Sequence, residues 1–330
     1  MNMQEFLGIE SMAQVGRHPF GIDSTMISED VSPQEVLTAA GLDWKVERRP
    51  LMAKLHGGMA APMIDVPDNF AIVRDIDNAV LGVVGKKYRP VQNVDTVGFM
   101  EALHQESEGG VKYDVAGALK GGRVVFVLAR LPGYVEHVGD DVSAKYVMVS
   151  NTHDGSGAFR AMITPIRVVC MNTYLYAMRK GRKSRTSVSI RHTSNVMSYV
   201  EDAKKALGFA QEAYNMYEEL SKQLVNYQMS VRNWNDFVNG LLEVKDPQKI
   251  HKRTQNTIDA LTEEFESGMG TDIPGVRGTA WAALNAVTSY NNYRRNVRGG
   301  EQSSRLYSSW FGSGANTAER ATNMLLQYAA

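Results

Sequence analysis

The residues with the clearest chemical potential are cations crowded into one short stretch. The segment RKGRKSRTSVSIRH (179–192) holds six Lys or Arg residues and no acid. Arginine can bind a phosphate through two parallel hydrogen bonds, and lysine supplies a mobile point charge. Gly181 allows a sharp turn, and Ser184 adds a hydroxyl donor. The pattern predicts a polyanion-binding surface, with a merely solvated loop as the alternative.

The region without acids extends well beyond that segment. No Asp or Glu lies between Asp154 and Glu201, although the whole chain has 36 basic and 36 acidic residues and a formal net charge of zero. A neutral total is compatible with a strongly positive local face. The predicted nucleic-acid contacts of this region are Arg160, Arg179, Lys180, Arg182, Lys183, Arg185 and Arg191.

A second candidate surface interleaves arginines with aromatic residues in SYNNYRRNVRGGEQSSRLYSSWFGSG (289–314). Aromatic rings stack on unpaired bases while arginines contact phosphates, so this mixture favours single strands over duplex. The predicted contacts are Tyr293, Arg294, Arg295 and Arg298. The alternative is a helix whose aromatic side chains fill the core while its arginines face water.

Catalytic patterns are weaker in this sequence. Cys170, the only cysteine, could act as a nucleophile with His153 or His192 as base, but its apolar neighbours favour a buried, inert thiol. The seven histidines form no H-x-x-x-H pair. A Mg²⁺-dependent nuclease could use one of three carboxylate pairs, although acids in turns are usually solvated. These pairs are Asp23/Asp30, Asp75/Asp77 and Asp140/Asp141. We therefore expect no catalytic residue, no metal and no cofactor.

The candidate residues must be positioned by an α+β fold, in which a hairpin-rich antiparallel sheet with packed helices precedes a mainly helical C-terminal half. Apolar runs at 70–84, 111–119, 123–131, 145–151 and 158–163 predict strands. Asp77-Asn78, Lys120-Gly121-Gly122 and Asp154–Gly157 predict their turns. The Gly- and Pro-rich residues 54–68 are typical of a loop. SVSIRH (187–192) alternates like a short strand.

Helices are predicted before, between and after these strands in the sequence, and throughout the second half of the chain. Ser32-Pro33-Gln34-Glu35 is a capping box, Asn93 can cap a helix over 94–107, and Thr164-Pro165 is expected to open a helix to about Lys180. Arg167 on that helix would pair with a carboxylate of the strand layer or lie beside Arg160. From Thr193 the spacing predicts a helix of about nine turns, then helices at 231–243, 254–267, 278–296 and 316–328. The expected division is 1–192, an α+β domain with a basic loop, and 193–330, a helical region.

Composition places the chain among ordinary soluble proteins. Apolar residues make up 43% of its 330 residues, and no apolar run is long enough to span a bilayer. The N-terminal MNMQEFLGIESMAQ lacks the basic and apolar regions of a signal peptide. With one cysteine, these features predict a soluble cytoplasmic protein.

The segment TPIRVVCMNTYLYA (164–177), together with KYRPVQN (87–93), resembles the phage/plasmid-like protein family of bacterial mobile elements. The family pattern is Pro-x-Arg-Val-Val-Cys-x-Asn-Thr, and the resemblance covers most of the chain. Its matches here are Pro165, Arg167, Val168, Val169, Cys170, Asn172 and Thr173. The family has no settled activity, so the resemblance implies a phage or plasmid setting in a bacterial cytoplasm. The layout is also similar to that of phage single-strand annealing proteins, an analogy of fold alone.

These observations predict a non-catalytic nucleic-acid-binding protein that binds single-stranded DNA or anneals strands in recombination or replication. A homo-oligomer is compatible with the long amphipathic helix, and no membrane partner is expected. Two alternatives remain open at this point. One is a protein-interaction module that modulates host or anti-defence functions, and the other is the metal-dependent nuclease.

Overall fold

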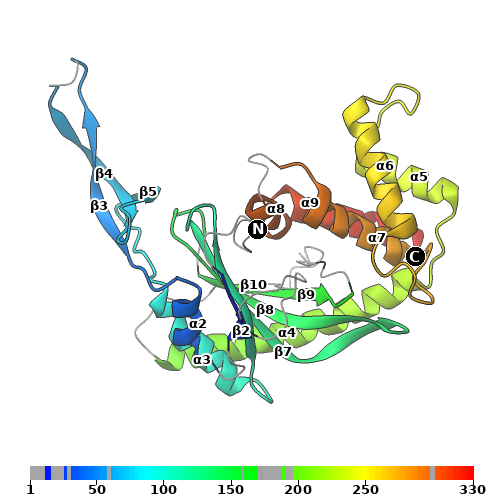
Figure 1. Ribbon diagram of the computed structural model, residues 1–330, viewed down its shortest axis with the longest axis horizontal. Helices are drawn as coiled ribbons and strands as arrows, with labels where there is room; N and C mark the ends of the chain where they lie inside the picture. The colour runs from blue at the N-terminus through cyan, green and yellow to red at the C-terminus, as the bar shows by residue number, and fades with distance from the viewer. Residues whose placement is uncertain are drawn as a thin grey trace.

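The chain folds into an α+β structure, as the sequence predicts. The computed structural model describes residues 12–15, 26–27, 31–57, 61–157, 159–169, 172, 187–189, 196–297 and 302–330. Within these residues two sheets precede a series of helices (Figure 1).

The larger sheet has seven strands in the order β10-β9-β8-β7-β6-β1-β2. Neighbours from β10 to β1 are antiparallel, and β1 pairs with β2 in parallel. The strands are β1 (Met12–Val15), β2 (Met26–Ile27), β6 (Lys112–Leu119), β7 (Val124–Val138), β8 (Asp141–Thr152), β9 (Arg160–Arg167) and β10 (Ser187–Ser189). The predicted turn between β6 and β7 is confirmed, because Lys120, Gly121 and Gly122 all have positive φ, at 53°, 68° and 87°.

Helices cover both faces of this sheet, which explains why its strands are apolar on both sides. Val125 and Val127 of β7 belong to the core formed with α4 (Val196–Val225). Phe126 and Leu128, which point the opposite way, pack with Leu306 and Trp310 of α8 (Gln302–Phe311). The sheet therefore lies between α4 and α8 (Figure 1).

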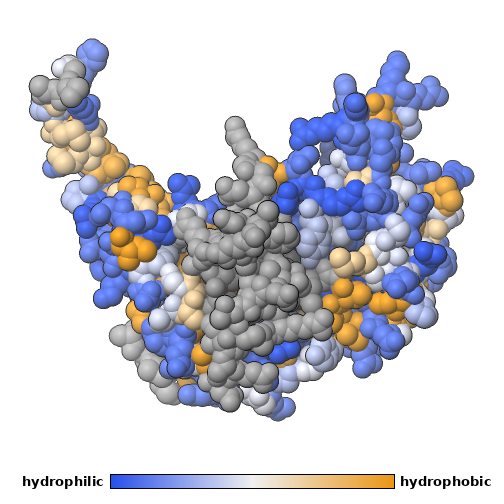
Figure 2. All heavy atoms as spheres, viewed as in Figure 1, coloured by the Kyte–Doolittle hydropathy of each residue, from blue (hydrophilic) through white to orange (hydrophobic). Residues whose placement is uncertain are grey.

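The smaller sheet forms an arm that projects from one end of the large sheet (Figure 1). It has the order β3-β4-β5, with β3 (Val46–Lys54), β4 (Met63–Arg74) and β5 (Val80–Gly85). Because β5 pairs only with residues 69–73 of β4, the outer arm is two-stranded. Met52, Leu55, Met63 and Ile64 are between 44% and 51% exposed there. Apolar side chains gather along the arm in Figure 2.

Short helices lie at the base of the arm. They are α2 (Pro33–Ala39), η1 (Val94–Thr96) and α3 (Val97–Glu106). The predicted capping box is confirmed, because Glu35 N donates to Ser32 Oγ and Ser32 N donates to Glu35 Oε2. Asn93 makes no side-chain cap; its Nδ2 donates instead to Leu42 O at 2.8 Å and ties η1 to the end of α2.

Most of the remaining helices lie at the other end of the large sheet, whereas α8 lies over its face (Figure 1). After α4 come α5 (Val231–Leu241), α6 (Lys252–Ser267), α7 (Ala280–Ser289), the π-helical turn η2 (Tyr290–Arg294), α8 and α9 (Ser313–Tyr328). One continuous apolar core runs from α2 and the large sheet through α4 into α5, α7 and α9. The division at 192/193 stays a prediction, although this core crosses it.

Two expected elements are wrong and one was not foreseen. Residues 164–167 continue strand β9 instead of opening a helix, because Thr164, Pro165 and Ile166 pair with Tyr146, Lys145 and Ala144 of β8. Most of the expected helix beyond them lies outside the described residues. Residues 63–68 belong to strand β4 and not to a loop, since Met63 and Ile64 pair with β3. Helix α8 was missed in the Gly- and Ser-rich 298–314.

Candidate functional site

Arg160 is the member of the basic region that the structure describes with an exposed side chain. It pairs with Ser150 of β8, which in turn pairs with Phe126 of β7. Since cross-strand partners share a face, Arg160 lies on the face that packs against α8. Arg179, Lys180, Arg182, Lys183, Arg185 and Arg191 lie outside the described residues, as does Arg298.

Helix α8 packs on the same face of the sheet as Arg160, and it carries both buried and partly exposed aromatic side chains. Trp310 is 3% exposed, and its ring meets Phe126 edge-on with centroids 4.9 Å apart, so it belongs to the core. Tyr307 and Phe311 are half-buried. The Lys120 ammonium lies 3.2 Å from the centroid of the Tyr307 ring, a cation–π contact at the rim of the sheet.

The other predicted contacts lie on η2, where the helix widens. Arg295 N donates to Tyr290 O at 2.8 Å, an i→i+5 bond that marks a π turn. The turn is anchored because Asn291 Nδ2 donates to Gly314 O at 3.1 Å. Gly314 needs to be glycine here, since a Cβ would lie 2.9 Å from Ser308 O. π turns of this kind often occur at functional sites.

A pocket of about 520 Å³ lies beside η2, between α5, α6 and α9. We call it the arginine pocket, because its lining includes Arg253, Arg294, Arg295 and Arg320 against one acid, Glu243. Its apolar wall consists of Leu241, Leu242, Leu261 and Val287, with the Tyr290 ring beside them. The structure thus brings Arg294 and Arg295 together with two arginines that the sequence analysis did not single out.

The four arginines differ in how their charge is balanced. Arg294 pairs with Glu263 and Glu264 at 2.7 and 3.2 Å, and the hydrogen bond with Glu263 raises its pKa. Arg320 pairs with Glu243 and donates to Leu241 O. These three ion pairs are what a solvated helix surface would show, so Arg294 and Arg320 need no ligand to balance their charge.

Arg295 has neutral partners for its charge. Its guanidinium donates to Asn291 Oδ1 at 3.2 Å, Ser313 Oγ at 3.1 Å and Thr317 Oγ1 at 3.4 Å. The side chain is half-buried, and this burial lowers the pKa of Arg295. Arg253 is exposed, and no carboxylate within the described part of the chain pairs with it. Two cations, Arg253 and Arg295, thus line the pocket without a carboxylate partner in the described structure.

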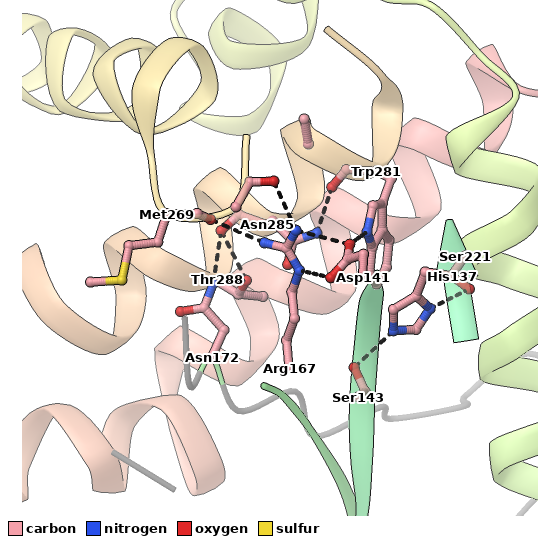
Figure 3. Close-up of polar contacts among 12 residues, drawn as sticks. His137, Asp141, Ser143, Arg167, Asn172, Ser221, Met269, Trp281, Asn285 and Thr288 are labelled. Atoms are coloured by element: carbon pink, nitrogen blue, oxygen red, sulfur yellow. Dashed lines mark hydrogen bonds and ion pairs between the residues drawn. The ribbon is translucent and has the colours of Figure 1, made fainter. Parts of the chain in front are cut away.

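A buried ion pair joins the sheet to the C-terminal helices (Figure 3). Arg167 Nε and Nη2 donate to the two oxygens of Asp141 at 2.6 and 2.8 Å, and Trp281 Nε1 of α7 donates to Asp141 Oδ2 at 2.7 Å. Arg167 also donates to the carbonyls of Met269 and Gly270. Both charged side chains are at most 2% exposed. The predicted pairing of Arg167 with a carboxylate of the strand layer is confirmed, and its role is structural.

His137 lies beside this pair, between two serines (Figure 3). Its Nδ1 is 2.7 Å from Ser221 Oγ of α4, and its Nε2 is 2.8 Å from Ser143 Oγ of β8. A serine–histidine contact could in principle activate a nucleophile. Both serines are fully buried, however, and a substrate could not reach them. The contacts instead fix the sheet against α4.

Two buried histidines are expected to make the stability of the fold depend on pH. It lowers the pKa of His137 and of His153 from 6.5 to about 4, because a buried imidazolium is poorly solvated. Between pH 6.5 and pH 4 the unfolded chain therefore binds more protons, so stability falls as pH falls. We expect each histidine to cost about 2 kcal/mol of unfolding free energy between pH 7 and pH 5. Urea unfolding at both pH values measures this loss.

The matched variant for that measurement is His137→Asn, which cannot gain a proton. Its own contacts with Ser143 and Ser221 change, so it is less stable at pH 7, but its further loss between pH 7 and pH 5 should be smaller than that of the parent. An equal pH-dependent loss in both proteins would show that His137 does not titrate in this window.

The candidate catalytic residues that the structure describes are not arranged as a catalytic site. His153, one candidate base, is fully buried with Nε2 2.9 Å from Asn93 Oδ1, while Cys170 and His192 lie outside the described residues. Asp77 pairs with Arg74 and Asp141 with Arg167. Among the residues that the structure describes, no group of three His, Cys, Asp or Glu side chains is arranged to hold a metal ion.

A family model described as Domain of unknown function (DUF932) matches residues 80–310, more than two thirds of the chain. The chain belongs to this family. No curated protein and no solved structure matches it. None of the helices described is both long and apolar enough to cross a membrane.

The DUF932 region runs from β5 to α8, so it contains the buried Asp141–Arg167 pair and most of the arginine pocket. Arg320, on α9, lies beyond it. Arg253 and Arg320 could not be identified from the sequence, because no motif beside either of them indicates a site. They reach Arg294 and Arg295 through helix packing, across about 40 and 25 residues of chain.

Proposed function

We propose that this chain is a nucleic-acid-binding protein of a phage or plasmid, which binds single-stranded DNA in recombination or replication in the bacterial cytoplasm. The observation that carries the proposal is the segregation of charge. Residues 155–200 hold eight Lys or Arg and no acid, in a chain of zero net charge. Such a stretch repels itself unless a polyanion or solvent neutralises it.

The geometry of the sheet supports the proposal. Arg160 opens the acid-free stretch on β9, on the same face as α8. The partly exposed ring of Tyr307 and the Lys120 ammonium lie at the rim of that face. Cations beside partly exposed aromatic rings suit a flexible strand, whose bases can stack while its phosphates are contacted. The strand meander followed by a long helix also fits the layout expected of single-strand annealing proteins, an analogy of fold alone.

The test is a titration of the full chain with labelled single-stranded DNA, double-stranded DNA and single-stranded RNA of equal length. We expect saturable binding at low salt, measured by fluorescence anisotropy, with single-stranded DNA bound more tightly than duplex. Duplex bound best would move the proposal to another class of nucleic-acid binding. Absence of binding to all three would leave the acid-free stretch as a solvated surface and would refute the proposal.

A further inference from the structure

The arginine pocket has features of a ligand site that are separate from the acid-free stretch. Its volume of about 520 Å³ falls in the range of about 300–1,000 Å³ typical of small-molecule sites. Its apolar wall faces a larger set of polar and charged side chains, so the pocket is more polar than most small-molecule sites and suits a charged ligand. A single water occupies about 30 Å³, so the pocket can hold much more than a bare inorganic anion.

The charged side chains of the pocket favour an anionic ligand. Four guanidinium groups line it, and Glu243 is the one acid of the lining. Glu263 and Glu264 balance Arg294, and Glu243 balances Arg320. Arg253 and Arg295 keep their charge without a carboxylate partner in the described structure. An anion bound by both would form charge-assisted hydrogen bonds with two guanidinium groups.

The neutral groups of the pocket indicate the rest of the ligand. Asn256 and Asn296 are exposed at its lining, and an asparagine amide can pair with both N6 and N7 of an adenine. The Tyr290 ring and Leu242 offer an apolar surface on which a base can stack. The Tyr290 hydroxyl lies 3.3 Å from Thr257 Oγ1, which holds the ring against α6. The combination of cations, amides and an aromatic ring suits a nucleotide.

We propose that the arginine pocket binds a nucleotide by its terminal phosphate, with Arg253 and Arg295 contacting the phosphate and Tyr290 contacting the base. The nucleotide is either free or the 5′-phosphorylated end of a DNA strand, and both present the same group. The pocket contains no residue of the acid-free stretch, so this proposal and the proposed function can be tested independently of each other.

Isothermal titration calorimetry of the full chain with dAMP tests this site. We expect saturable binding of dAMP and no binding of deoxyadenosine at the same concentration, because the phosphate supplies the charge. Arg253→Gln should weaken binding about tenfold or more, and Arg295→Gln at least as much. Arg253 is exposed, so its loss leaves the fold intact even if Arg295→Gln destabilises η2. Arg232→Gln is the matched control, since Arg232 lies on α5 with an 89% exposed side chain outside the pocket lining.

Further arms distinguish the two sources of phosphate. A 5′-phosphorylated oligonucleotide that competes with dAMP better than its 5′-hydroxyl twin would identify a strand end, and failure of both strands to compete would identify the free nucleotide. Equal competition by both would contradict recognition of a terminal phosphate. Equal affinity for dAMP and deoxyadenosine, no binding of dAMP at millimolar concentration, or full affinity in Arg253→Gln would overturn the proposal. Replacing Arg179, Lys180, Arg182 and Lys183 should leave dAMP binding unchanged.

Discussion

Asp141→Asn is expected to destabilise the protein by about 3–5 kcal/mol, because it leaves the Arg167 guanidinium buried without a counter-charge. Arg167 is 2% exposed and its carboxylate partner is fully buried, so water cannot replace the lost charge. Trp281 Nε1 also loses its charged acceptor. Urea unfolding of the parent and the variant at neutral pH measures the difference.

The control for this experiment is Asp236→Asn at an exposed pair. Asp236 faces Arg232 one helical turn away, and their side chains are 60% and 89% exposed. Exposed pairs of this kind contribute at most about 1 kcal/mol. A loss of less than about 1 kcal/mol in Asp141→Asn as well would contradict the role we give the pair. Replacing both partners by apolar residues should recover part of the loss.

Removing four cations of the acid-free stretch is expected to produce the largest change in binding. Replacing Arg179, Lys180, Arg182 and Lys183 by glutamine removes four phosphate contacts if each side chain makes one. At about 1 kcal/mol per contact, affinity for single-stranded DNA at low salt should fall roughly 100- to 1,000-fold. Fluorescence anisotropy gives the affinities, and circular dichroism shows whether the fold is kept.

The matched control removes the same amount of charge elsewhere. Arg49, Lys86, Lys222 and Arg232 each pair with an acid and lie on the arm, α4 and α5. Replacing these four by glutamine changes the net charge equally, so any effect of total charge appears in both proteins. Equal affinities in the two quadruple variants would show that the acid-free stretch makes no specific contribution.

Local signals predicted those elements of the fold whose formation is decided by neighbouring residues. The turn at Lys120–Gly122 has left-handed backbone at all three residues, a conformation that glycine adopts at little cost. The turn could therefore be predicted from these three residues alone. The period of Val200, Leu207 and Leu220 predicted α4, whose packing against the sheet then buries the stripe. The capping box at Ser32 and Glu35 is equally local.

Long-range pairing decided the elements that the sequence could not predict. Thr164-Pro165 is a common helix start, but β8 offers a continuous ladder to β9, and pairing there overrides the local preference. Proline at 165 is tolerated in the strand although it lacks an N–H. Arg167 could be expected to pair with a carboxylate, yet only the fold identifies Asp141, and only helix packing brings Arg253 and Arg320 to Arg295.

The salt dependence of single-stranded DNA binding tests the central claim most directly. A protein that neutralises phosphates releases counter-ions, so log K falls with log salt by about 0.7 per phosphate on a single strand. We predict a steep negative slope for the parent and a slope shallower by about 3 for the variant lacking Arg179, Lys180, Arg182 and Lys183. Affinity that does not change with salt, or the same slope in both proteins, would contradict the account.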